Sequence, residues 1–250
     1  MSPVEISAII FACIFGSAML GMWLHGMLPE HHLNSETKDL VKLGVGLIGT
    51  MAALLLGLLV ASAKSSYDTR GSELTQFAAN TILLDRVLAH YGPETGELRR
   101  IIKVAMAGFI DQVWPKAGRR EGGVDAQTSR EVIFDKIQEL QPHSDSQRAF
   151  QSQAESLAMS LGQTRWLLFA QSGSAISTPF LVVVAFWLSV LFVSFGLFAP
   201  RNATAVVTLL VSAISIAGAL FLILELDHPF SGLIQVSSAP LRNALTVLGR

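Results

Sequence analysis

The sequence contains little charge and a single cysteine. Only 15% of its 250 residues are Asp, Glu, Lys or Arg, well below the roughly 25% of a typical soluble domain. The net charge of −1 provides no excess of basic residues, which argues against a nucleic-acid partner. Cys13 is the only cysteine and lies within an apolar run, so no disulfide can form within the chain. These scarcities argue against a soluble nucleic-acid-binding protein and exclude a disulfide-stabilised domain.

The sequence also lacks the patterns of a β-sheet and of an enzyme. No stretch of useful length alternates between apolar and polar residues, as a half-buried strand does. No Ser-His-Asp, Cys-His or nucleotide-binding arrangement stands out, so we expect neither enzyme activity nor a cofactor. His31 and His32 lie near His25 and Glu30, but adjacent histidines point to different faces of a helix and no second pair has ligand spacing. We therefore expect no metal site.

Long apolar runs dominate what is present. The chain is 51% hydrophobic and its mean hydropathy is +0.49. About 20 apolar residues suffice to cross a bilayer as a helix. Four such runs lie at about residues 6–28, 40–63, 179–199 and 203–224, and Pro29 and Pro200 mark the ends of the first and third. We expect an all-α integral membrane protein whose four transmembrane helices form two hairpins, at 1–63 and 179–224, within the lipid bilayer.

The segment between the hairpins, residues 64–178, is polar overall and has helical periodicity. Gly92-Pro93 and Trp114-Pro115 are expected to end two helices. A loop is expected at 118–123, followed by a short helix that Pro142 ends. Ser144 or Asp145 can cap the start of a further helix. The sequence therefore predicts a helical domain at 64–178 and a tail at 225–250.

The second apolar run carries small residues on one face. Gly49, Ala53, Gly57 and Ala61 recur at every fourth position and so lie nearly in line on a helix. Such a ridge lets helices approach closely in lipid. Gly44–Gly49 also matches the GxGxxG fingerprint, but the strand that should precede that fingerprint is missing. The candidates for packing or for lining a pore are Gly49, Thr50, Ala53, Leu54, Gly57, Leu58 and Ala61.

Two acidic residues, Glu225 and Asp227, directly follow the fourth run. Carboxylates at a membrane boundary can bind a cation or face a permeation path, and they can equally be interfacial caps. Pro229 cannot continue the helix, so the chain must bend there. Phe230 could then anchor the tail, and His228 completes this candidate motif.

Two motifs carry a resemblance to a known family. The first is GLLVASAKSSYD at 57–68, and the second is ELDHPFSG at 225–232, continuing through VSSAPL at 236–241. Together they resemble a bacterial membrane family described as bestrophin-like, over essentially the whole chain. His228-Pro229-Phe230-Ser231 is similar to the Asn-Pro-Phe-Gly turn of bestrophins, which are homopentameric anion channels with a narrow apolar neck. The acidic run that follows this turn in calcium-gated bestrophins is absent.

The resemblance implies a homo-oligomer, a pentamer by analogy, that conducts small inorganic ions, with anions expected and the second span around the axis. It also implies the bacterial inner membrane. An even number of spans places both termini, the central domain and the tail on one side. Lys64, Arg70 and Arg165 near the membrane ends favour the cytoplasm for that side.

Two other functions stay open. A proton-channel subunit like those of flagellar stators or TolQ-type proteins also combines few spans with a helical cytoplasmic part. That chemistry needs a polar or ionisable group within the ring, and Thr50 is the clear mid-span candidate in the second run. The other alternative is a non-transporting, membrane-tethered helical scaffold or sensor.

Overall fold

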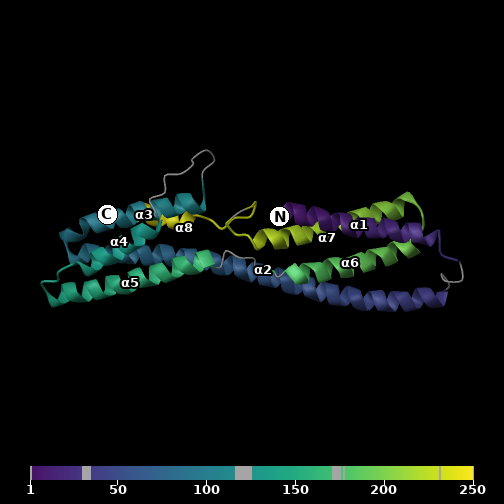
Figure 1. The fold of residues 1–250 in the computed structure, drawn as a ribbon, viewed down its shortest axis with the longest axis horizontal. Helices are drawn as coiled ribbons and strands as arrows, with labels where there is room; N and C mark the ends of the chain where they lie inside the picture. The colour runs from purple at the N-terminus through teal and green to yellow at the C-terminus, as the bar shows by residue number, and fades with distance from the viewer. Residues whose placement is uncertain are drawn as a thin grey trace. The chain divides into compact units, whose positions relative to one another are not determined.

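A computed structural model of the chain describes residues 2–29, 35–115, 126–170, 176, 178–230 and 232–249. Within these ranges it contains helices and no strands, so the predicted all-α class is confirmed. Glu30, His31, His32 and the loop expected at 118–123 lie outside the described residues. The helices are α1 (Pro3–His25), α2 (Ser35–Tyr91), η2 (Pro93–Thr95), α3 (Gly96–Val113), α4 (Ala126–Gln138), α5 (Asp145–Ala170), α6 (Thr178–Phe198), α7 (Ala203–Leu226) and α8 (Ala239–Val247) (Figure 1).

Four helices, α1, α2, α6 and α7, are long and apolar enough to cross a membrane. Each of them overlaps one of the four predicted runs, although α1 ends at His25 and not at about residue 28. Helix α2 has 57 residues because it continues beyond its apolar part to Tyr91, which makes the insert's first helix continuous with the second span. It ends at Gly92, whose φ of +151° suits glycine.

The chain divides into two compact units, residues 1–67 with 174–234 and residues 68–173 with 235–250. Helix α2 contributes to both. In the first unit α1 packs against α6 and α7. The buried core of this unit includes Ile14, Ala18, Val184, Leu188 and Phe192. The grouping of the spans into two hairpins stays a prediction.

The contact between α1 and α6 is close because two glycines face each other's backbones. A Cβ added to Gly21 would overlap the carbonyl oxygen of Val193, and a Cβ added to Gly196 would overlap the carbonyl oxygen of Ala18. Each glycine thus lies directly on the main chain of the other helix. This is how small residues let membrane helices pack through their backbones.

Polar contacts join the C-terminal ends of α1 and α6. Arg201, just after α6, donates a hydrogen bond from Nη2 to the carbonyl oxygen of Met22 at 2.9 Å. His25 places Nδ1 2.7 Å from the carbonyl oxygen of Leu197. A cation at a helix C-terminus also complements the helix dipole. These contacts fix the ends of both helices.

The second unit is a helical bundle formed by the C-terminal part of α2 with α3, α4, α5 and α8. Leu88, Ile102, Ile137 and Ala154 lie in its core. The expected cap is present, since the amide of Gln147 donates to Oγ of Ser144 at 3.2 Å and α5 begins at Asp145, directly after Ser144. Helix α8, which packs on α3, was not predicted within the tail.

A buried ion pair holds the end of the tail in this bundle. Arg99 donates from Nε and Nη2 to the two carboxylate oxygens of Asp85, at 2.8 and 2.9 Å. The same carboxylate accepts the amide of Gly249 at 3.3 Å. Hydrogen bonding to Asp85 raises the pKa of Arg99 above its usual value, although partial burial acts to lower it, so the guanidinium stays charged.

Candidate functional site

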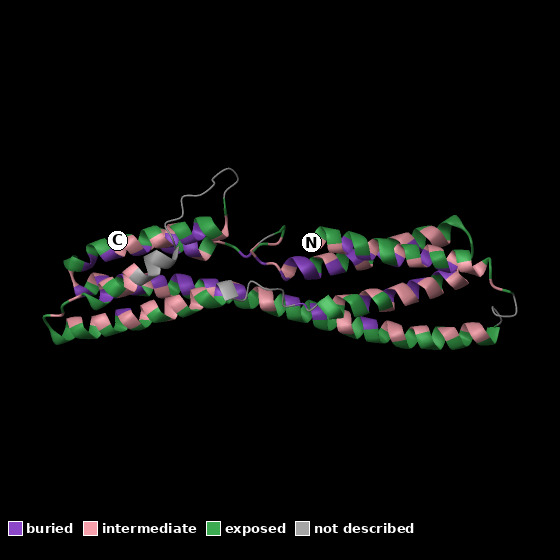
Figure 2. Ribbon diagram, in the orientation of Figure 1, coloured by how far each residue is buried: buried purple, intermediate pink, exposed green. Residues whose placement is uncertain are grey.

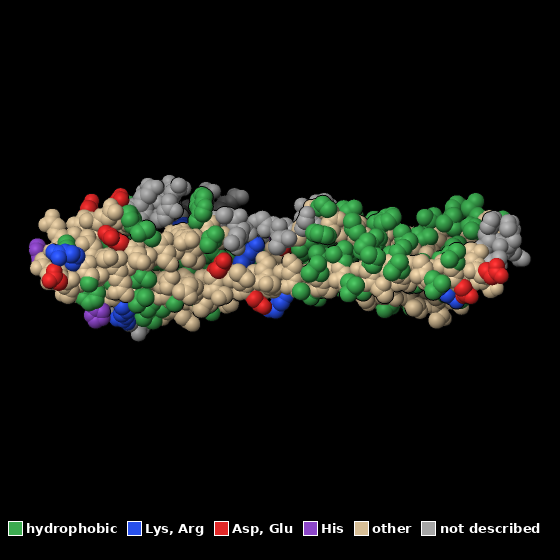
Figure 3. Space-filling view, turned by 90° about the horizontal axis from the view of Figure 1, so that it is seen from below, with side chains coloured by type: hydrophobic (Ala, Val, Ile, Leu, Met, Phe, Trp, Pro, Cys, Tyr) green, Lys and Arg blue, Asp and Glu red, His purple; other side chains and the backbone are tan. Residues whose placement is uncertain are grey.

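Helix α2 is the least buried of the four candidate membrane spans. Only 11% of the residues in its most apolar 18-residue stretch are buried within the chain, against 28–33% in the corresponding stretches of the other three spans. Figure 2 shows the spanning part of α2 as mainly exposed. In the space-filling view hydrophobic side chains crowd the face formed by the spanning helices, and charged side chains lie toward its ends (Figure 3). This face therefore needs lipid or protein to cover it.

The buried and exposed residues of α2 lie on different faces. Leu47, Leu54 and Leu58 are exposed, Leu54 at 76%. Three other residues of α2, Ala52, Leu59 and Ala63, are buried within the chain. Each of them follows one of the exposed leucines by five positions, which corresponds to roughly 140° around a helix at about 100° per residue. One side of α2 thus packs on its own chain, and the leucines point away from that packing.

The small-residue ridge is also uncovered. Ala53, Gly57 and Ala61 are exposed, and a Cβ added to Gly57 would meet no atom within 4 Å. Gly49 is half-buried and would meet Cδ2 of Leu191 at 3.6 Å. The hydroxyl of Thr50 donates to the carbonyl oxygen of Leu47 at 2.8 Å within the same helix. The ridge leaves room for the backbone of another helix along its Gly57 part.

Glu225 lies in the interior of the chain, with only 2% of its surface exposed. Its Oε2 accepts the amides of Leu233 at 2.7 Å and Ile234 at 3.4 Å. The carboxylate also packs on Gly232, whose φ is +94° and which has no Cβ to obstruct the approach. Glu225 therefore holds the loop after α7 through charge-assisted hydrogen bonds. The capping interpretation fits these contacts.

The rest of the motif forms the bend after α7. Asp227 is the C-terminal cap residue of the helix and is 1% exposed. His228 places Nδ1 3.0 Å from the carbonyl oxygen of Leu224. Pro229 is buried and Phe230 half-buried. The helix ends at Leu226, three residues before Pro229, because proline supplies no amide hydrogen for a further turn.

A comparison with models of protein families shows which family the chain belongs to. The model of the Bestrophin-like domain matches residues 12–241, which include the greater part of α1, the other three spans, the insert and the motif after α7. The chain belongs to the bestrophin-like family. The resemblance seen in the two motifs is thereby confirmed. No match was found among the curated proteins or among the solved structures.

Two features of this bestrophin-like chain were not found from its sequence. The close-packed glycines are Gly21 and Gly196, whereas the sequence had predicted close packing at the ridge of α2. Each is one small residue among several in its run, which is a weak signal without knowledge of the partner helix. The amides that Glu225 accepts gave no signal, since any loop residue can supply an amide.

Among the described residues no group of His, Cys, Asp and Glu is arranged to hold a metal ion.

Replacing Glu225 by alanine is expected to loosen the loop at 232–234. The substitution removes the acceptor of two amides, at a cost of about 1–2 kcal/mol. Hydrogen–deuterium exchange should become faster at Leu233 and Ile234, and the temperature of unfolding should fall. Glu36→Ala is the matched control, because Glu36 is an exposed glutamate of the same unit. Equal exchange in Glu225→Ala and the parent protein would contradict the assigned role.

Proposed function

We propose that this bestrophin-like protein is an oligomeric ion channel that conducts anions, with α2 lining the ion path. The observation that carries the proposal is the uncovered face of α2, which combines exposed leucines with exposed small residues. If the exposed face carried leucines alone, lipid tails could cover it. Small residues in line gain little from lipid tails but allow a second helix to pack closely.

A ring of α2 helices would place a narrow apolar segment around the axis. The stretch from Leu43 to Ala63 contains no charged residue. Leu54 and Leu58 are exposed and large enough to form a constriction that closes by dewetting. The family resemblance suggests five subunits.

The surroundings of Glu225 agree better with anions than with cations. A carboxylate facing the path would attract cations and repel anions. The Glu225 carboxylate instead accepts backbone amides inside the chain. Lys64, at the end of the apolar stretch, is exposed, and its Nζ lies 5.4 Å from the ring centre of Tyr67. A basic residue there raises the local concentration of anions.

The proton-channel alternative has less support. It requires a side chain within the ring that can carry or relay a proton. Thr50 already donates its hydroxyl hydrogen to Leu47 in its own helix. The scaffold alternative remains an outcome of the flux experiment.

The function is tested with purified protein reconstituted into liposomes. The oligomer is sized first, and chloride and potassium fluxes are then measured in opposing salt gradients. We expect an oligomer whose reversal potential follows the chloride gradient. A potential that follows potassium would overturn anion selectivity. A stable oligomer that passes neither ion would overturn the channel and favour the scaffold.

We further propose that the protein lies in the bacterial inner membrane with both termini and the helical unit in the cytoplasm. Single cysteines at Asp39 and Glu139, both exposed, test this in a Cys13→Ser background. An impermeant maleimide should label the cysteine at position 39 in intact cells and the one at 139 only after lysis. The reverse pattern would invert the topology.

A further inference from the structure

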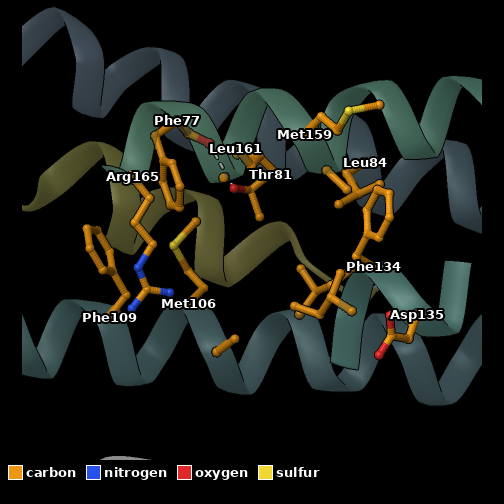
Figure 4. Close-up of a pocket in the computed structure, with 15 residues that line it drawn as sticks. Phe77, Thr81, Leu84, Met106, Phe109, Phe134, Asp135, Met159, Leu161 and Arg165 are labelled. Carbon is orange, nitrogen blue, oxygen red and sulfur yellow. Dashed lines mark hydrogen bonds between the residues drawn. The ribbon is translucent and has the colours of Figure 1, made fainter. Parts of the chain in front are cut away.

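The second unit contains an apolar cavity that no part of the proposed channel uses. Its volume is about 400 Å³, within the roughly 300–1,000 Å³ of small-molecule pockets. Helices α2, α3, α4 and α5 all contribute to its lining (Figure 4). The apolar residues that line it and are labelled in Figure 4 include Phe77, Leu84, Met106, Phe134 and Met159.

The lining offers few polar groups to a ligand. Thr81 is 3% exposed, and its hydroxyl donates to the carbonyl oxygen of Phe77 at 2.8 Å, so this hydrogen is already used. Among the described residues that line the cavity, Arg165 of α5 and Asp135 of α4 are charged. Figure 4 shows them at different ends of the cavity. The cavity thus has an apolar body with a cation at one end and an anion at the other.

The guanidinium of Arg165 has an aromatic neighbour in α3. It lies over the ring of Phe109, 5.2 Å from the ring centre, an arrangement that favours a cation on the ring face. With five donors, the group can bind a carboxylate in addition to its contacts within the chain.

We propose that this cavity binds a single-chain amphipathic carboxylate, such as a medium-chain fatty acid. The hydrocarbon chain lies among the apolar side chains, where it restores the dispersion contacts that an unfilled cavity loses. The carboxylate pairs with Arg165, and Asp135 disfavours the reversed orientation by charge repulsion. This inference does not depend on whether the protein conducts ions.

The test uses the full-length protein in nanodiscs of phosphatidylcholine, titrated with decanoate and, separately, with decanol. Heats from empty discs are subtracted. We expect saturable binding of decanoate. Arg165→Gln should weaken decanoate binding about tenfold or more, since it removes a charge-assisted pair, and should change decanol binding by less than about twofold. Ala158→Phe, which fills the cavity, should weaken the binding of both ligands.

Arg148→Gln is the matched control, because Arg148 is an exposed arginine of the same helix that pairs with Asp145. It should leave both affinities unchanged, and circular dichroism should show that every variant keeps its helices. Absence of saturable decanoate binding, or equal losses in Arg165→Gln and Arg148→Gln, would overturn the proposal. Loss of decanoate binding in discs that contain phosphatidylglycerol would assign the cavity to membrane lipid and would also overturn it.

Discussion

Replacing Gly196 by alanine is expected to destabilise the spanning unit, although alanine is the better helix former. The new Cβ would overlap the carbonyl oxygen of Ala18, and the amide nitrogen of Met22 would lie only 3.0 Å away. Backbone atoms cannot rotate aside, so α1 and α6 must separate. Overpacking of this kind costs about 1–3 kcal/mol. Gly21→Ala should behave similarly, because its Cβ would overlap the carbonyl oxygen of Val193.

The controls for this prediction are Gly16→Ala and Gly218→Ala. Both glycines lie in spanning helices, and an added Cβ meets nothing within 4 Å at either position. Each control should be neutral or slightly stabilising, by up to about 1 kcal/mol, since alanine loses less backbone entropy in a helix. The change in stability thus has opposite signs at the two kinds of site. The change in stability is measured as the shift in aggregation temperature in detergent, with size-exclusion chromatography as the readout.

Leucine at Gly196 should have a larger effect than alanine and should prevent correct assembly of α1 with α6. The double variant Gly21→Ala/Gly196→Ala should be less destabilised than the sum of the single variants, because one separation of the helices relieves both overlaps. If Gly196→Ala were as stable as Gly16→Ala, the close contact of α1 with α6 would be wrong.

Replacing Gly57 by leucine is expected to abolish assembly and flux while the single subunit stays folded. Gly57 is exposed, and a Cβ added to it meets no atom of the chain within 4 Å, so we expect the single subunit to accommodate a leucine side chain there. Between subunits, however, it would fill the gap into which another helix packs. The expected signature is a shift from oligomer to smaller species on size exclusion, with loss of chloride flux and unchanged helix content.

The matched control is Gly218→Leu, since Gly218 is an exposed glycine of α7 with equally open surroundings. It should assemble and conduct like the parent protein. If Gly57→Leu also assembled and conducted normally, the ridge of α2 would not be an interface and the proposed position of α2 would be wrong. The outcome therefore separates an oligomer contact from simple exposure to lipid.

The sequence by itself determined the features that depend on neighbouring residues. The length of an apolar run decides whether a helix can cross a bilayer, so the four spans were predictable. The ends of α2 and α3 followed from Gly92-Pro93 and Trp114-Pro115, and the start of α5 from the hydroxyl of Ser144. Each of these signals acts within one helical turn. The family resemblance was likewise carried by two short continuous motifs.

The tertiary structure alone decided which residues meet across the chain. Gly21 and Gly196 are 175 positions apart, and only the packing of α1 against α6 makes both glycines essential. Glu225 could have faced an ion path until the loop at 232–234 supplied its amides. The tail helix α8 has nine residues, too few for a stable helix on its own in water, and packing on α3 stabilises it. Periodicity shows which face of a helix is apolar, but the partner that covers that face depends on long-range contacts, which no local pattern encodes.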